Sequence, residues 1–364
     1  MSALSQQNNK RIAKNTLLLY FRMLFSMGIG LFTSRIVLES LGIEDYGIYN
    51  LVGGIVTIFA FLNSAMIATS QRFISYELGK GNLHKLKDVF CTTLTIHIAI
   101  AFIIVVLSEV IGVWFLNTKL NIPSDRMMAA NWTLQLSIFV FAVNVISVPY
   151  NASIVAHEKM SAFAYISIFE VSLKLAIAYL LLFISYDKLI VYSILVFCVA
   201  LLLRSLYCFY CKRHFEECHY TFSFNIEQFR EMFAFAGWSL VGNLGFSFKD
   251  QLSSILLNLF FGTVVNAARG ISVQVGSLIN SFSANFMMAM NPQITKSYAV
   301  GDLYRSKELV YAGCRFSFYL LAVISLPIMI NITYILNLWL VEVPQYTDIF
   351  SDINDCMQSF VCYI

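Results

Sequence analysis

Long apolar runs alternate with short polar breaks along most of the chain. A helix needs about 20 apolar residues to cross the hydrocarbon core of a bilayer, and these runs have that length. Reading them between their breaks predicts membrane-spanning helices near residues 16–38, 47–69, 90–116, 132–154, 161–184, 189–211, 234–261, 270–290 and 309–331. A further run starts near Leu336. The pattern predicts an all-α polytopic membrane protein with about 9 to 10 helices.

The composition excludes a water-soluble protein. Of the 364 residues 59% are hydrophobic and 12% charged, whereas soluble domains carry roughly 25% charged residues. The first apolar run follows Lys10, Arg11 and Lys14, as the core of a secretory signal would. It is longer than such a core, contains Arg22 and lacks a small-residue cleavage site. We therefore expect it to be retained as the first transmembrane helix.

The basic residues predict the orientation of the chain in the membrane. With the N-terminus inside, fifteen of the 24 Lys and Arg residues fall in cytoplasmic segments. The external segments hold only four, which are Lys119, Arg126, Lys188 and Arg269. Because cytoplasmic loops of membrane proteins carry an excess of Lys and Arg, we expect a cytoplasmic N-terminus in a bacterial inner membrane.

The chain also contains an internal repeat. A shift of 220 positions, the separation of Gly81 from Gly301, places the basic segment 81–87 over the segment 301–307. One repeat would hold six helices, so both copies would have the same orientation, as in many secondary transporters. We expect a first six-helix lobe over residues 1–215 and a partial second lobe of about three to four helices over residues 216–364.

The second copy falls short of the first by about two helices. After Pro344 the sequence places Asp348, Asp352 and Asp355 where an apolar span should form. We therefore expect an early end of the second lobe, or a tail read out of frame.

Several short motifs resemble a known family. The segment 35–49 contains an LGxxxYGxY turn, and Gln71-Arg72-Phe73 opens the following cytoplasmic loop. Further matches are 148–151 with 156–160, and 266–270. In order and spacing, these motifs resemble the Wzx-like polysaccharide branch of the multidrug, oligosaccharidyl-lipid and polysaccharide (MOP) export superfamily.

The resemblance implies a MATE-like, two-lobed helical bundle that acts as a flippase and not as an enzyme. It implies that the protein carries a polyprenyl-pyrophosphate-linked oligosaccharide from the cytoplasmic to the external leaflet, for lipopolysaccharide or capsule synthesis. Its expected partners are that lipid-linked oligosaccharide, membrane lipids and proteins of polysaccharide assembly, with no nucleic acid and no cofactor. Because the second lobe is expected to end early, an alternative is that the chain is an inactive remnant of such a flippase.

Charged residues inside the predicted spans are candidate site residues, because a charge in the bilayer is costly. Arg22 could contact a pyrophosphate arriving from the cytoplasm, or extend to the headgroups. Arg35 is a further candidate, but Glu39 four residues later offers it a local ion pair. Glu170 and Lys174 have the same spacing, and a Lys174 that faces a cavity would attract an anionic lipid.

Lys249 and Asp250 are the main candidates for the transport site. They lie in mid-span beside Gly242, Asn243 and Gly245, which permit close packing or a local break of the helix. Since adjacent residues point about 100° apart on a helix, Lys249 could bind the substrate while Asp250 binds a coupling ion or pairs with a neighbouring Arg.

Other functions find less support in the sequence. The CxxCxxHxxxCH string of residues 208–219 could suit zinc, but its first two cysteines fall at the membrane-buried end of a span, so we expect no metal site. No GxxxxGK[ST] loop is present. A lone intramembrane His97 is more typical of a helix contact than of a proton relay. A multidrug cation antiporter of the same superfamily and an integral-membrane polysaccharide enzyme remain as alternatives.

Overall fold

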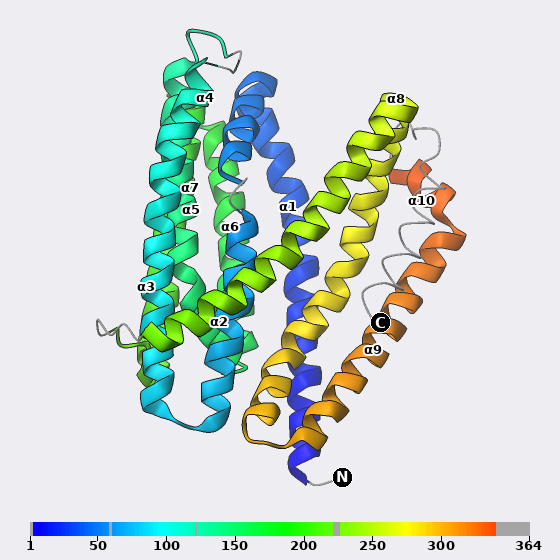
Figure 1. Cartoon of the computed structure of the whole chain (residues 1–364). Coiled ribbons are helices and arrows are strands. Elements are labelled where there is room, and N and C mark those ends of the chain that lie inside the picture. Colours follow the sequence, from blue (N-terminus) through cyan, green and yellow to red (C-terminus); the bar gives the residue numbers. More distant parts are fainter. Residues whose placement is uncertain (1–2, 58–59, 119, 121, 221–225, 340–364) are drawn as a thin grey trace. The chain divides into compact units, whose positions relative to one another are not determined.

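The computed structural model describes residues 3–57, 60–118, 120, 122–220 and 226–339. These residues form helices, turns and short connections, with no strand among them. The α-helices are α1 (Ala3–Thr57), α2 (Ala60–Lys80), α3 (Leu83–Leu107), α4 (Val113–Thr118), α5 (Met127–Ala156), α6 (Met160–Leu182), α7 (Lys188–His214), α8 (Ile226–Ala299), α9 (Leu303–Ile330) and α10 (Ile332–Trp339) (Figure 1). A π-helical turn, Ser108–Gly112, joins α3 to α4, and a 3-10 turn, Glu216–Cys218, follows α7.

Six of the described helical segments are long and apolar enough to cross a membrane: Lys10–Gly42, Leu83–Thr118, Met127–Ala156, Met160–Leu182, Lys188–His214 and Leu303–Ile330. Each contains most or all of a span predicted from the sequence. The predicted all-α polytopic membrane fold is therefore confirmed. The segment 340–364, which includes the unusual acidic tail, lies outside the described residues.

Two of the long helices contain a change of direction. In α1, Gly42 has φ 79° and ψ 170°, a conformation open to glycine but disfavoured for other residues. This break separates the predicted spans 16–38 and 47–69. Helix α8 has 74 residues, which would give about 111 Å if it were straight. Figure 1 shows that α8 reverses direction near its middle, in agreement with the two spans predicted there.

The chain divides into two compact units. The first unit comprises residues 17–240, and the second comprises residues 1–16 with 241–364. The start of α8 packs on the first unit, where Met232 and Ala236 are buried against Met66 and Ile96. The lobe boundary between residues 215 and 216 stays a prediction.

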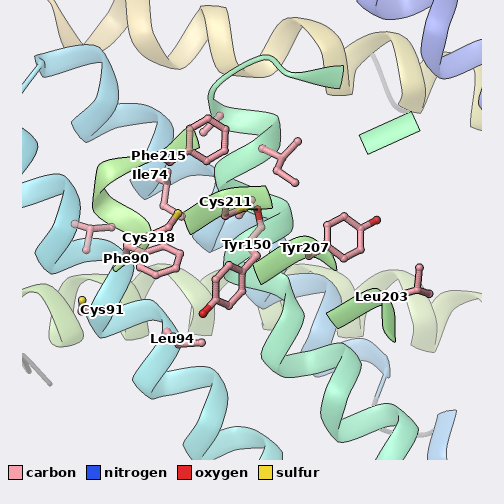
Figure 2. Packing of buried hydrophobic residues seen from close by; sticks show 14 of the residues in the cluster. Ile74, Phe90, Cys91, Leu94, Tyr150, Leu203, Tyr207, Cys211, Phe215 and Cys218 are labelled. Atoms are coloured by element: carbon pink, nitrogen blue, oxygen red, sulfur yellow. Dashed lines mark hydrogen bonds between the residues drawn. The ribbon is translucent and has the colours of Figure 1, made fainter. Parts of the chain in front are cut away.

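The first unit has its largest apolar core where α2, α3, α5 and α7 meet. Phe90 packs edge-on against Tyr150, with ring centroids 5.3 Å apart. Cys91, Cys211 and Cys218 are buried in the same cluster and carry free thiols. Figure 2 shows these side chains gathered between the helices. The cysteines therefore contribute to the packed core, where free cysteine behaves as a small apolar residue.

One end of the first unit is fastened by a group of charges. Arg126 donates to both carboxylate oxygens of Asp45, at 2.8 Å from Nε, and to Asp187 at 2.8 Å from Nη1. Asp187 also caps α7, since its side chain accepts from the backbone N–H groups of Leu189 and Ile190. The hydrogen bond to Asp45 raises the pKa of Arg126, and the bond to Asp187 adds to this shift. Asp45 in the last part of α1, Arg126 before α5 and Asp187 before α7 are distant in sequence and are thus held at one place.

The other end of the first unit has a second polar contact. His157 Nε2 lies 2.6 Å from Oε1 of Glu217, whose side chain is 3% exposed. The imidazole stacks on Phe215 with ring centroids 4.0 Å apart. Beside it, Glu158 has a positive φ of 59°, which is uncommon for a residue other than glycine. This contact joins the α5–α6 turn to the segment after α7.

Candidate functional site

Four side chains of α6 form a stripe along one face of this helix. Phe163, Ser167, Glu170 and Lys174 are separated by four, three and four residues, and residues at these spacings lie above one another on a helix. The stripe runs for about 16 Å along the axis, at 1.5 Å per residue. It lies within a helix that is long and apolar enough to span the membrane. Its polar members are therefore placed at membrane depth.

Glu170 and Lys174 form the ion pair that their spacing predicts. Lys174 Nζ lies 2.6 Å from Glu170 Oε1. The two side chains are 44% and 32% exposed, for Lys174 and Glu170 respectively. A paired lysine and glutamate cost less inside a bilayer than two isolated charges. The pair thus explains how α6 tolerates both residues, while leaving part of each side chain open to a ligand.

Arg22 brings a second helix to the same stripe. Its guanidinium lies over the ring of Phe163, 4.8 Å from the centroid, at a distance typical of a cation–π contact. Arg22 also interacts electrostatically with Glu170 and with Tyr207 of α7. Two predicted site residues, Arg22 and Lys174, are therefore brought to one stripe of the first unit, 152 positions apart in the sequence.

Tyr207 completes this group from α7. It is buried, and its side chain interacts with that of Ser167. Figure 2 places Tyr207 next to the core formed by Tyr150 and Cys211. We refer to the whole group as the α6 cluster, which consists of Arg22, Phe163, Ser167, Glu170, Lys174 and Tyr207.

The α6 cluster carries an excess of positive charge. Arg22 and Lys174 are basic and Glu170 is acidic. Charges interact more strongly where water is scarce than in bulk solution, and both basic groups are hydrogen-bond donors suited to phosphate oxygens. The arrangement can attract and orient an anion.

The other predicted site residues lie elsewhere. Arg35 and Glu39 are both exposed on α1. No ion pair within 4.0 Å joins these two described side chains, so the local pair expected for Arg35 is not formed. Lys249 is exposed on α8 and belongs to the second unit. The side chain of Asp250 lies outside the described residues, as do those of the motif 266–270.

Arg204 has a partner that the sequence did not reveal. Pro149 in α5 lacks the N–H that would continue the helix ladder, and such a residue opens the turn around it. Arg204 Nη1 donates to the carbonyl of Ile146 in that turn. Its guanidinium also lies over the Tyr150 ring, 4.7 Å from the centroid. This intramembrane arginine therefore binds the backbone of α5 just before Pro149.

His97 and Glu109 make helix contacts. His97 is fully buried in α3, and its Nδ1 lies 2.7 Å from the carbonyl oxygen of Thr93. This bond lies within α3, so the helix–helix contact expected of His97 stays a prediction. Glu109 lies in the π-helical turn and accepts a hydrogen bond of 2.7 Å from Gln135. The turn thus aims a carboxylate at the neighbouring helix α5.

Comparison with protein families identifies the ancestry of the chain. Residues 12–298 match the family described as polysaccharide biosynthesis protein. A curated relative is the uncharacterized membrane protein EpsK of Bacillus subtilis (strain 168), which is 19% identical over 285 residues. The match covers 77% of this chain and 55% of that protein, so the chain spans about half the length of the relative.

Solved structures show the same fold. The Vibrio cholerae MATE transporter VcmN in its bent form matches with a TM-score of 0.82 at 14% identity, over 96% of this chain and 80% of that chain. A MOP superfamily transporter from Pyrococcus furiosus, described as having a binding pocket of reversed polarity, matches with a TM-score of 0.75 at 12% identity, over 96% and 77% of the two chains. The fold is thus MATE-like, and from the family match over residues 12–298 we conclude that the chain belongs to the polysaccharide biosynthesis protein family.

Proposed function

We propose that this protein transports a polyprenyl-pyrophosphate-linked oligosaccharide from the cytoplasmic to the external leaflet. The observation that carries the proposal is the α6 cluster, in which Arg22 and Lys174 lie on one face of a membrane-spanning helix pair. A pyrophosphate linkage is the part of such a substrate that cannot enter the hydrocarbon core without compensation. Basic groups at membrane depth lower this barrier.

The two basic side chains suit the two parts of a pyrophosphate. Arginine binds phosphate through a planar fork of donors, whereas lysine provides a compact charge on a flexible stem. Arg22 is held against Phe163 and interacts electrostatically with Glu170, the carboxylate that pairs with Lys174. We infer that the pyrophosphate enters from the side of Arg22 and is then held by Arg22 and Lys174 together.

This direction agrees with the predicted orientation. Lys10, Arg11 and Lys14 precede Arg22 by about 12 to 18 Å along α1, at 1.5 Å per residue. If these residues lie at the inner surface of a bacterial plasma membrane, Arg22 faces the entrance used by a cytoplasmic substrate. In this proposal residues 1–215 and 216–364 supply the two lobes, and proteins of polysaccharide assembly deliver and remove the substrate.

A multidrug cation antiporter is the second candidate, because transporters of that kind share the fold. A site for organic cations requires an excess of acidic groups. The α6 cluster has Glu170 as its acid, and that carboxylate is already paired with Lys174. The sign of the charge therefore favours an anionic lipid.

The proposal is tested by export of a labelled lipid-linked oligosaccharide in cells depleted of their own flippase. We expect the 364-residue chain to restore export, and Arg22→Ala and Lys174→Ala to reduce it at least tenfold at equal membrane levels. Lys212→Ala is a matched control, because Lys212 is exposed at the end of α7 and outside the α6 cluster. If the inserted chain exports organic cations but not the lipid, the cation antiporter replaces the present proposal.

A further inference from the structure

Lys174 is already paired with Glu170 of its own helix, so a ligand must displace this carboxylate before it can bind Lys174. We propose that Glu170 is a specificity-determining residue, which holds Lys174 until a ligand with two adjacent phosphates displaces it. Lipids with a single phosphodiester would then be excluded. This inference rests on the proposed function of the α6 cluster.

The geometry of the Glu170–Lys174 ion pair allows a ligand to replace Glu170 as the partner of Lys174. Glu170 and Lys174 are on the same face of α6 at a separation of 2.6 Å, and each side chain is partly exposed. Because an i, i+4 pair is formed within one helix, opening it requires a change of rotamer and no change of the backbone. A ligand can therefore reach Lys174 without unfolding any part of the first unit.

Arg22 makes the exchange depend on the charge of the ligand. It interacts electrostatically with Glu170, so this carboxylate partly neutralises both basic groups of the α6 cluster. A single phosphodiester has one negative charge and would only replace the carboxylate at Lys174, with no gain in attraction. A pyrophosphate diester has two, and can satisfy Lys174 and Arg22 together. The net attraction thus distinguishes one phosphate from two.

The surroundings of the protein make this discrimination useful. A bilayer contains anionic phospholipids at high local concentration, and they gather at basic groups of membrane proteins. Without Glu170, Arg22 and Lys174 would bind these phospholipids. Specificity of this kind is a difference of two affinities and can be obtained by opposing the unwanted ligand. Glu170 provides that opposition.

The experiment compares two synthetic probes that differ by one phosphate: farnesyl pyrophosphoryl N-acetylglucosamine and farnesyl phosphoryl N-acetylglucosamine. Binding of each is measured on the purified 364-residue chain in lipid nanodiscs, for the wild type and for Glu170→Gln, which keeps the shape and removes the charge. We expect the variant to bind both probes more tightly, and to lose about tenfold of the preference for the pyrophosphate, equivalent to about 1.4 kcal/mol.

Two further variants keep the test decisive. Glu216→Gln is the matched control, since Glu216 is exposed and outside the α6 cluster; we expect it to keep the wild-type preference. Glu170→Asp shortens the carboxylate while keeping its charge, and should show an intermediate preference even if the glutamine variant does not fold. A purely structural role for Glu170 would change stability without changing the ratio of the two affinities.

The outcomes separate the two proposals. If the wild type binds the pyrophosphate probe and the Glu170 variants keep its preference, the role of Glu170 is refuted while the proposed function stands. If the wild type binds neither probe, the proposed function fails and this inference fails with it.

Discussion

Asn82 and Asp302, which are 220 positions apart in the sequence, begin α3 and α9 in the same way. The Oδ1 of Asn82 accepts from the backbone N–H of Lys85 at 3.1 Å, and the Oδ1 of Asp302 accepts from that of Arg305 at 2.9 Å. Each cap directly follows a glycine with positive φ, 70° at Gly81 and 81° at Gly301. The internal repeat detected in the sequence is thus a repeat of local structure as well.

The shared cap predicts equal responses at the two positions. Asn82→Ala and Asp302→Ala should each lower the free energy of unfolding by about 1 kcal/mol, since each removes an N-cap acceptor. Thermal unfolding of the purified protein in detergent measures the loss. The exchanges Asn82→Asp and Asp302→Asn retain a capping oxygen and should be close to neutral. A large loss in either exchange would show that these side chains do more than cap.

Arg126 should stabilise the first unit in a salt-dependent manner. Its side chain is 22% exposed and pairs with two carboxylates. We expect Arg126→Ala to cost about 1 kcal/mol at low salt, because partly exposed pairs are screened by water and ions. The difference in unfolding midpoint between variant and wild type should shrink from 50 mM to 1 M NaCl, an increase of about twentyfold in ionic strength.

Lysine is the informative replacement at this position. Arg126→Lys keeps the charge but cannot donate to Asp45 and Asp187 through a planar fork. It should therefore restore only part of the lost stability. Full restoration would mean that charge alone, without the geometry of the guanidinium, holds the three segments together.

Glu217 should contribute more to stability than its neighbour Glu216. Its side chain is 3% exposed and contacts His157, whereas Glu216 is exposed. Glu217→Ala removes a partner of a partly buried polar group, which costs about 1 to 3 kcal/mol. Glu216→Ala should be within about 0.5 kcal/mol of the wild type. Comparable thermal unfolding of the two variants would contradict the role assigned to the His157 contact.

Lys249 is predicted to be required for transport, on the sequence argument that a mid-span charge serves function. Lys249→Ala should abolish export of the labelled lipid-linked oligosaccharide while the protein still inserts into the membrane. Lys307→Ala, which removes an exposed basic residue of α9, should leave export unchanged. Unchanged export by the Lys249 variant would remove this residue from the site.

The sequence by itself determined the features that depend on neighbours along the chain. Apolar runs of spanning length fixed the membrane class, because no other environment accepts them. The Gly81 and Gly301 segments fixed the repeated turn, because positive φ favours glycine. The Glu170–Lys174 pair followed from an i, i+4 spacing, which brings two side chains together on any helix.

Only the tertiary structure decided which distant residues meet. Arg22 was predicted as a site residue, but its contact with Phe163 and its link to Tyr207 depend on how α1 packs against α6 and α7. The sequence places Arg126 in an external segment, and only the fold brings Asp45 and Asp187 around it. Contacts of this kind join residues tens of positions apart or more, and helix period and charge count carry no information about them. Packing of the helices alone sets their partners.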